Sequence, residues 1–389
     1  MFYKFIKIWI RLGLLFYCRK ISFTDRAVLK SKGPLLLACN HPNSFLDAII
    51  VGSQFNRPVH FLARGDVFRK PLTKKILSAL KMIPIYRLSE GREYLALNDA
   101  TFEKCVDILA SGGIVLIFAE GLCVNQWALR PLKKGAARIA WNAFSNSIIR
   151  QQFRVIPVGI NYNGFAKSGK QVIVHFGQAI TTGHFSSIYA SGDFIQHFNH
   201  LLQSALQNAM LFDNDSGSII PFLISNCNNA NNNVNIITDL KLRQQNAVQN
   251  NLLVVQPLIS PGLVTTTRLY FLFNVLGYIL LMLPALTGWL LHIILLYPLD
   301  ILVRKKTNGT VFYDSVMFGS LLLLYPFYWI FINIISLQFL PLYTLKAIVC
   351  MAPFFVVVYL IWVDCAQRLG NYLRLSPDQR KMLTAEIMD

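Results

Sequence analysis

Charged residues are scarce in this chain, and acidic residues are the scarcest. Of its 389 residues, 14% are charged and 54% are hydrophobic, whereas an average soluble domain has roughly 25% charged residues. The 37 Lys and Arg residues outnumber the 19 Asp and Glu residues, which gives a formal net charge of +18. An apolar and basic composition favours anionic lipids and phosphorylated small molecules as partners. Nucleic acid is not an expected partner, because the sequence has no zinc-finger spacing and no RNA-binding aromatic motif.

Several signatures of other chemistries are absent as well. The 7 cysteines include no Cys-x-x-Cys pair, so we expect no disulfide framework and a reducing compartment for the soluble part. Cys39 and Cys123 are interpreted as small buried core residues. The patterns Gly-x-Ser-x-Gly, His-Glu-x-x-His and Gly-x(4)-Gly-Lys-Ser/Thr do not occur, which argues against serine hydrolases, zinc proteases and nucleotide hydrolases. We expect no metal and no tightly bound cofactor.

The first 21 residues mix aromatic, aliphatic and basic side chains. Lys4, Lys7 and Arg11 interrupt the apolar residues, and the longest uncharged stretch, 12–18, is too short to span a bilayer. The stretch also lacks the cleavage site of a signal peptide. Residues 1–21 therefore predict an amphipathic interfacial helix. The alternative is an ordinary helix packed on the core, which has a similar hydrophobic pattern.

Residues 22–212 alternate short apolar runs with amphipathic stretches, which is typical of a layered α/β domain. In such domains, functional residues gather at the carboxyl ends of the strands. The predicted strands are 35–39, 59–63, 83–86, 114–119, 154–161 and 172–176. The predicted helices are 44–54, 71–80, 92–111, 133–146 and 193–210.

The chain changes character after residue 212. Residues 213–262 form a polar, Asn-rich linker, with a further helix considered near 236–248. Residues 263–370 are a predicted membrane region, and 371–389 a cytoplasmic tail.

The membrane region contains three long apolar segments. Residues 316–337 and 342–363 are long enough to span a bilayer, whereas 269–302 fits either one tilted span or a re-entrant hairpin broken at Pro284. Basic residues at 304–306 favour a cytoplasmic position for the connection that follows the first segment. Since the basic domain before it is also expected in the cytoplasm, the hairpin with two spans is the favoured interpretation. The protein is thus predicted to be an integral membrane protein with its α/β domain on the cytoplasmic face.

The most informative stretch runs from Asn40 to Asp47. The apolar residues 35–38 predict a buried strand, and Asn40-His41-Pro42 follow it directly. A His can accept a proton near neutral pH, and a carboxylate can fix its tautomer and stabilise its cation. Positions i and i+6 fall on different faces of a helix, so we expect His41 in the loop and Asp47 reaching back from an early helical turn. The alternative is a His near a helix cap and an unrelated surface Asp.

Three later segments also place polar residues at strand ends. Arg87 can bind a phosphate with two hydrogen bonds, and Gly121, beside Glu120, lets the backbone approach a ligand closely. Lys133 and Lys134 precede a helix whose N-terminus suits a phosphate, although solvated charges on a helix face are the alternative. These segments are 83–87, 117–121 with 130–135, and 155–159.

Together the four segments resemble the motifs of the glycerolipid acyltransferase family. That family carries Asn-His-x(4)-Asp, Gly-x-Ile-x-Ile-x-Arg, Phe-Pro-Glu-Gly and an apolar Val-x-Pro strand, and the resemblance covers about 25–210. Here five residues separate His41 from Asp47, Lys81 takes the place of a Gly, and Ala119 that of a Pro. The longer His–Asp spacing is similar to that of branches that look like glycerol-3-phosphate acyltransferases.

The resemblance implies a fold and a set of site residues. The fold is an acyltransferase domain with a mixed sheet flanked by helices, followed by a C-terminal helical transmembrane region. His41 is the implied general base and Asp47 its orienting carboxylate. The implied substrate-binding residues are Asn40, Arg87, Glu120, Gly121, Lys133 and Lys134.

The resemblance also implies a reaction. A fatty acyl group passes from an acyl-CoA or acyl carrier protein thioester to the hydroxyl of glycerol-3-phosphate or a lysophospholipid, in phospholipid biosynthesis. The expected partners are membrane lipids, the thioester donor and the phosphorylated glycerol acceptor. Basic residues along 64–81 suit anionic headgroups or coenzyme A phosphates, or are simply solvated. Acylation of another lyso-lipid, in remodelling or on an aminolipid, and a non-catalytic lipid-binding role are the competing hypotheses.

Overall fold

The computed structural model describes most of the chain and divides it into two compact units. The described residues are 2–87, 90–185, 191–212, 224, 236–238, 240–242, 267–339 and 343–373. The first unit comprises Met1–Leu14, Lys20–Ala166 and Lys170–Lys241, and the second comprises Leu15–Arg19, Lys167–Gly169 and Leu242–Asp389. Most of the predicted linker and tail lies outside the described residues, although 236–238 and 240–242 are helical.

A seven-stranded sheet, counted over the described residues, forms the centre of the first unit. Its order is β1-β7-β6-β2-β5-β3-β4. The central strand β2 pairs in parallel with both β5 and β6, while β7 runs antiparallel to β6. All five residues of β2 are buried, as expected for a strand covered on both faces. The strands are β1 (Cys18–Phe23), β2 (Leu35–Cys39), β3 (Val59–Arg64), β4 (Met82–Ile85), β5 (Ile114–Phe118), β6 (Arg154–Tyr162) and β7 (Lys170–Phe176).

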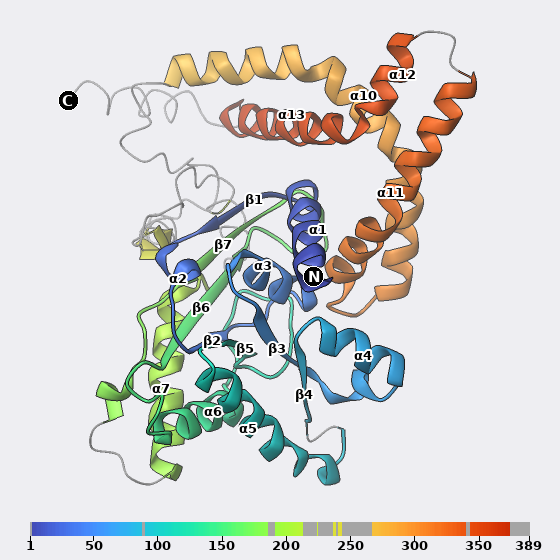
Figure 1. Ribbon diagram of the computed structural model, residues 1–389. Helices are drawn as coiled ribbons and strands as arrows, with labels where there is room; N and C mark the ends of the chain where they lie inside the picture. The colour runs from blue at the N-terminus through green and yellow to red at the C-terminus, as the bar shows by residue number, and fades with distance from the viewer. Residues whose placement is uncertain are drawn as a thin grey trace, which may run out of the picture. The chain divides into compact units, whose positions relative to one another are not determined.

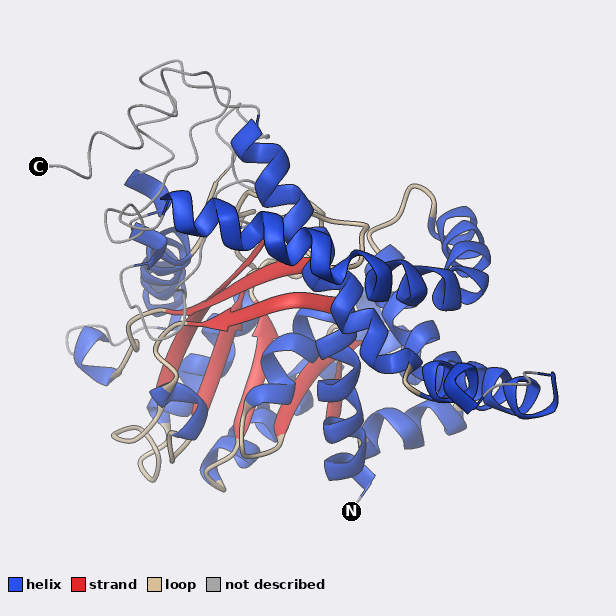
Figure 2. Cartoon of the chain, turned by 90° about the horizontal axis from the view of Figure 1, so that it is seen from above, coloured by secondary structure: helices blue, strands red, loops and turns tan. Residues whose placement is uncertain are grey.

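Helices cover both faces of this sheet (Figures 1 and 2). Side chains of α5, α6 and α7 pack with one another and with alternate residues of the strands, such as Leu36, Val115 and Ile117, in one core. α3 lies on the opposite face (Figure 1). The predicted mixed sheet flanked by helices is therefore confirmed. The helices are α2 (Ala27–Lys30), α3 (Phe45–Gln54), α4 (Pro71–Ala79), α5 (Leu97–Ala110), α6 (Lys134–Ser145) and α7 (Ser191–Ala209).

The N-terminal helix α1 (Phe2–Tyr17) is shorter than predicted. The predicted helix extended to residue 21, but residues 18–23 form strand β1, which lies beside β7 at the edge of the sheet. Thr24, directly after β1, donates its backbone N–H to the carbonyl of Val174 at 3.1 Å. Pairing with a strand distant in sequence decides this conformation, and local periodicity does not report such pairing.

The apolar face of α1 points away from the first unit. Phe2, Phe5, Ile8 and Leu12 recur at helical spacing, and Phe5 and Ile8 are 65% and 60% exposed. A helix of a soluble domain normally buries such a stripe. The alternative of an ordinary core-packed helix is therefore wrong for this face.

The opposite face of α1 is held by polar contacts. Arg11 donates from Nε to the carbonyl of Ser53 at 2.7 Å and from Nη2 to that of Gln54 at 3.0 Å. Lys7 donates to the carbonyl of Phe55. These carbonyls end α3, where unpaired acceptors and the helix dipole favour cations. α1 is thus fixed to the helix that carries Asp47 at its other end.

The first apolar segment of the second unit is a single helix. α10 (Thr267–Thr307) runs through both Pro284 and Pro298, so the hairpin favoured for 269–302 is wrong. A proline removes one backbone hydrogen bond and bends a helix, but the apolar residues around Pro284 offer no turn at which the chain could reverse. Val275–Thr307 and Tyr313–Phe339 are long and apolar enough to cross a membrane, and the latter is helix α11.

The last apolar segment is bent. The predicted span 342–363 consists of α12 (Tyr343–Cys350) followed by α13 (Ala352–Leu373), with an angle of 67° at the break. Pro353 is the second residue of α13, where it lacks an N–H and sterically disfavours a continuous helix before it. Within this unit α13 packs closely on α10, where a Cβ on Gly288 would meet the carbonyl oxygen of Phe355 at 2.4 Å.

Gly159 provides a test of the packing around β6. A Cβ at this position would lie 2.0 Å from the carbonyl oxygen of Ala209, the last residue of α7. We expect Gly159→Ala to lower the stability by about 1–3 kcal/mol, because a backbone contact cannot rotate away. Gly192→Ala is the matched control, since nothing lies within 4 Å of its added Cβ. Thermal unfolding in detergent measures both, and equal melting temperatures for the two variants would contradict this packing.

Candidate active site

Most of the predicted site residues lie near the carboxyl ends of three adjacent strands, whereas Arg87 follows β4 at the edge of the sheet. Cys39, the last residue of β2, pairs with Phe118 of β5 and Val158 of β6. The segments that follow β2 and β5, together with the end of β6, therefore meet at one edge of the sheet. This is where ligands bind in open α/β sheets.

His41 and Asp47 are in direct contact. His41 Nδ1 lies 2.9 Å from Asp47 Oδ2, with His41 in the loop and Asp47 in the first turn of α3, as the spacing predicts. The imidazole stacks on Phe118 with ring centroids 3.7 Å apart, and 12% of the His41 side chain stays exposed. Nδ1 is engaged, and Nε2 has no hydrogen bond within the described part of the chain, so Nε2 is the nitrogen available to a substrate.

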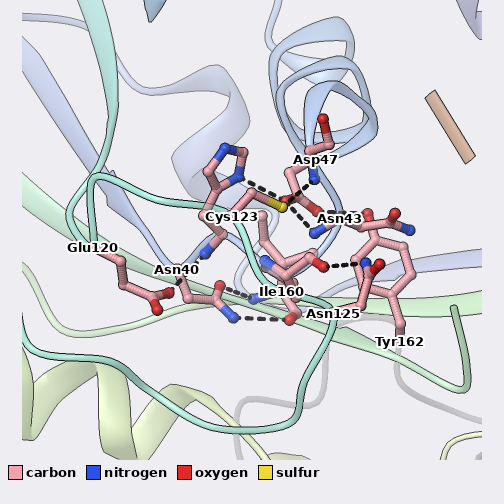
Figure 3. A network of polar contacts seen from close by, with 11 residues as sticks. Asn40, Asn43, Asp47, Glu120, Cys123, Asn125, Ile160 and Tyr162 are labelled. Carbon is pink, nitrogen blue, oxygen red and sulfur yellow. Dashed lines mark hydrogen bonds and ion pairs between the residues drawn. The ribbon is translucent and has the colours of Figure 1, made fainter. Parts of the chain in front are cut away.

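Asp47 is held on both of its carboxylate oxygens. The backbone N–H of Asn43 donates to Oδ2 at 2.7 Å, and the Tyr162 hydroxyl donates to Oδ1 at 2.8 Å. Figure 3 shows these side chains converging from the β2–α3 loop, α3 and β6. Asp47 and Tyr162 are both fully buried. A carboxylate held by this many donors has one orientation, which suits a residue that orients an imidazole.

Sequence reasoning did not identify Tyr162. The predicted strand ended at residue 161, and the motif of 155–159 drew attention to apolar residues. In the structure β6 continues to Tyr162, and Trp127 Nε1 donates to its carbonyl at 2.8 Å. A hydroxyl-bearing aromatic residue at the carboxyl end of a central strand is the signal that could have found it.

Asn40 makes contacts within the protein that differ from its predicted role in substrate binding. Its side-chain nitrogen donates to the Ile160 carbonyl at 3.1 Å, and its side-chain oxygen accepts from the Ile160 N–H at 2.7 Å. The side chain is 1% exposed. It therefore joins the end of β2 to β6 in place of the predicted substrate contact.

Glu120 is likewise engaged by backbone groups. Oε1 accepts from the His41 N–H at 2.8 Å and Oε2 accepts from the Arg130 N–H at 3.1 Å. Burial raises the pKa of this carboxyl, against the lowering effect of the two N–H donors. Glu120 thus fixes the loop of His41, and the predicted hydrogen bonds to acceptor hydroxyls do not match this arrangement.

Gly121, Lys133 and Lys134 lie at the turn from β5 to α6. Gly121 has a φ of +68°, and an added Cβ would come within 2.8 Å of Lys133 Cγ. Lys133 is the N-cap of α6 and Lys134 its first residue. Both lysine side chains are exposed, which leaves an anion contact and simple solvation equally compatible with their positions.

Arg87 is a half-buried cation two residues after the end of β4. Burial lowers its pKa, the nearby charge of Arg64 lowers it further, and Glu90 and Asp66 oppose both effects. Within the described ranges Arg87 has no ion-pair partner, whereas Arg64 pairs with Asp66. A half-buried guanidinium without an ion-pair partner is suited to bind an anionic group of a ligand.

Cys123 lies beside the His–Asp pair, which corrects the prediction of a core residue. It is partly exposed, whereas Cys39 is fully buried as predicted. Its Sγ accepts the Ser44 N–H at 2.8 Å. Burial, with a smaller contribution from Asp47, raises the pKa of this thiol to about 12, so a thiolate nucleophile is not favoured at neutral pH.

The departure at Lys81 has a structural consequence. Lys81 adopts a φ of +64°, in the left-handed region that glycine occupies at little cost. The family motif has Gly at this position, and the chain here accepts a strained lysine, at a cost of roughly 1–2 kcal/mol.

The site and its fold define an acyltransferase domain, and comparison with known proteins agrees. The profile of the Acyltransferase family matches residues 20–161. The chain is 27% identical over 141 residues to the chloroplastic 1-acyl-sn-glycerol-3-phosphate acyltransferase BAT2 of Brassica napus, a match that covers 36% of this chain and 39% of that relative. These two matches confirm the predicted resemblance to the glycerolipid acyltransferase family.

A solved structure gives a further similarity. The 1-acyl-sn-glycerophosphate (LPA) acyltransferase PlsC from Thermotoga maritima aligns with a TM-score of 0.39 at 14% identity, over 54% of this chain and 78% of that one.

Glu120→Gln tests the role of this carboxylate in fixing the His41 loop. The Gln amide can accept only one of the two N–H donors, so one stays buried without a partner, and we expect a loss of about 1–3 kcal/mol in stability. Glu103→Gln makes the same chemical change on an exposed face of α5 and should change stability by less than about 0.5 kcal/mol. Thermal unfolding compares the two, and an unaffected Glu120→Gln would overturn the assignment.

Proposed function

We propose that this protein transfers a fatty acyl group from a thioester to the hydroxyl of glycerol-3-phosphate or a lysophospholipid. The observation that carries the proposal is the buried, doubly held Asp47 and its contact with Nδ1 of His41, which leaves Nε2 without a hydrogen bond among the described residues. The family of the domain and the name of the Brassica napus relative support the acceptor class. The match spans 39% of that relative's length.

The geometry supports direct transfer. Nδ1–H of His41 donates to Asp47, and Nε2 accepts the proton of the acceptor hydroxyl as its oxygen attacks the thioester carbonyl. The imidazolium that forms is stabilised by Asp47 and cannot rotate, because the ring stacks on Phe118. When the tetrahedral intermediate collapses, the carbon–sulfur bond breaks and Nε2 returns the proton to the departing thiolate. The chemistry at sulfur is the same for acyl-CoA and for acyl carrier protein, so both remain proposed donors.

Arg87 is the proposed phosphate ligand of the acceptor. It is half-buried, it lacks an ion-pair partner among the described residues, and Arg64 adds positive charge nearby. A guanidinium binds a phosphate through two hydrogen bonds. Lys133 and Lys134, at the N-terminus of the 12-residue helix α6, are proposed as further phosphate contacts, because the helix dipole favours anions there.

The two long apolar helices of the second unit suggest membrane association, and we propose that the protein is integral to the membrane. Because α10 is continuous, the charge-distribution argument that relied on a hairpin no longer determines the orientation. The cytoplasmic face is proposed instead from the cysteines: Cys18, Cys39, Cys105, Cys123, Cys350 and Cys365 are all free, as expected in a reducing compartment.

The apolar stripe of α1 is proposed to lie in the bilayer interface. Its exposed Phe5 and Ile8 have no protein surface to cover in the first unit, while Lys7 and Arg11 are already used in contacts with α3. Interfacial helices bury such a stripe at the boundary of headgroups and acyl chains. This arrangement fixes α3, and with it Asp47, close to lipid substrates.

His41→Ala and Arg87→Ala test the two halves of the site with purified protein, labelled acyl thioesters, and glycerol-3-phosphate or lysophosphatidic acid as acceptor. Loss of the base should lower kcat about 10²–10⁴-fold. Loss of the Arg87 guanidinium should raise KM for the phosphorylated acceptor about ten- to hundredfold, since hydrogen bonds to charged groups contribute about 1.5–3 kcal/mol, with the KM for the donor unchanged.

His197→Ala and Arg150→Ala are the controls, because both residues are exposed and neither is one of the site residues. The acceptor that is used with the higher kcat/KM identifies the substrate. Absence of transfer to every acceptor with both donors would favour the lipid-binding hypothesis. An equal loss of activity in the control variants would remove the support for His41 and Arg87.

Photocrosslinking tests the position of α1. A benzoylphenylalanine at position 5 or 8 should form adducts with lipid, because both side chains point outward, whereas the same group at Tyr3 should crosslink within the protein, because Tyr3 accepts the Val59 N–H at 3.2 Å. Mass spectrometry after irradiation in vesicles distinguishes the adducts. Lipid adducts at position 3 and none at positions 5 and 8 would contradict the proposed orientation.

A further inference from the structure

Cys123 lies close to His41 and Asp47, and all three side chains are of types that bind metal ions. The proposed acyl transfer uses His41 and Asp47 but gives Cys123 no role. The ligand atoms of His41, Asp47 and Cys123 all lie within 4.8 Å of one another. No other group of at least three such side chains occurs among the residues that the structure describes. The donors are an imidazole nitrogen, a carboxylate oxygen and a sulfur, and Zn²⁺ is bound in proteins by each of these three ligand types.

We propose that His41, Asp47 and Cys123 bind a divalent transition-metal cation such as Zn²⁺, and that this cation switches off the general base. The inhibitory consequence depends on the proposed function, whereas the metal site depends only on the geometry of the three side chains.

The charge and geometry of the group suit such a cation. Asp47 and a metal-bound Cys123 thiolate together carry two negative charges, so a divalent cation gives a neutral site, which burial favours. Zn–N and Zn–O bonds of about 2.0–2.2 Å and a Zn–S bond of about 2.3 Å require His41 Nδ1 and Asp47 Oδ2, now 2.9 Å apart, to separate slightly while Cys123 Sγ moves toward the cation. The Ser44 N–H already donates to Sγ at 2.8 Å, and this hydrogen bond would be retained by a thiolate.

Metal binding changes the protonation of His41 in a defined way. The cation takes the lone pair of Nδ1, so the proton that Nδ1 shares with Asp47 has to leave that nitrogen, and the neutral ring carries its proton on Nε2. The thiol proton of Cys123 is released to solvent. An Nε2 that carries a proton cannot accept one from the acceptor hydroxyl, and Asp47 Oδ2 no longer orients the ring. The metal-bound site is therefore inactive until a chelator removes the cation.

A simpler role for Cys123 is to accept the hydrogen bond from the Ser44 N–H. Cys123→Ser separates the two, because a serine oxygen can accept this hydrogen bond but is a far weaker ligand for a soft cation than a thiolate. Cys350→Ser is the matched control, since Cys350 is exposed and lies in α12.

The binding test uses Co²⁺ with the purified full chain. A thiolate bound to Co²⁺ gives a charge-transfer band in the near ultraviolet. We expect this band in the unsubstituted protein and in Cys350→Ser, and expect its loss in Cys123→Ser and in His41→Ala. His41→Ala provides the check if Cys123→Ser does not fold. A band that persists in folded Cys123→Ser or in His41→Ala, or no band in the unsubstituted protein, would overturn the proposed site.

The inhibition test uses Zn²⁺ with the acyl-transfer assay. The rate of each variant with Zn²⁺ is compared with the rate of the same variant without metal. Half-inhibition of Cys123→Ser should require at least tenfold more Zn²⁺ than half-inhibition of Cys350→Ser. Addition of EDTA should restore the rate. Equal sensitivity of the two variants would overturn the switch. The two tests separate the proposals: a Co²⁺ band without any acyl transfer contradicts the proposed function alone, and acyl transfer without a band contradicts the metal site alone.

Discussion

The parallel pairing of β2 with both β5 and β6 is the constraint on which the site depends. Because β2 lies between these strands in register, the loop that leaves it is held from both sides, by Glu120 on one and by Ile160 on the other. These contacts fix the backbone of His41 independently of the contacts that its side chain makes. Asp47, bound by Asn43 and Tyr162, then fixes the imidazole. The rigidity of the base is thus a property of the sheet edge as a whole.

Residues with polar side chains at the strand ends divide into two groups in this structure. Asn40, Glu120 and Tyr162 are buried and hydrogen-bonded within the protein, and their contribution is to position others. Arg87 has an unpaired charge among the described residues, and the exposed edge of His41 is open to a substrate. Substitutions in the first group act through stability and alignment, whereas those in the second act on the reaction itself.

The sequence predicted the alternation of strands and helices and the contact of His41 with Asp47, because each depends on local periodicity or short spacing. The mixed sheet was implied by the family resemblance. The sequence could not predict β1, since pairing with β7 decides its conformation, nor the continuity of α10, since Pro284 is compatible with both a bend and a break. Asn40 and Glu120 were predicted to contact substrate because motif residues at strand ends often do. In the structure both side chains bind backbone groups of the protein instead. The partner of Asn40 is 120 residues away in sequence, and the two partners of Glu120 are 79 and 10 residues away.

The central claim is that the imidazole of His41 removes the proton of the acceptor hydroxyl. Chemical rescue tests this claim most directly: acyl transfer by His41→Ala is measured with increasing concentrations of free imidazole in the buffer. The account predicts a very low rate without imidazole and a rate that rises with its concentration, while Asp47→Ala is not rescued. A His41→Ala variant that transfers acyl groups at the rate of the unsubstituted protein without imidazole would contradict it.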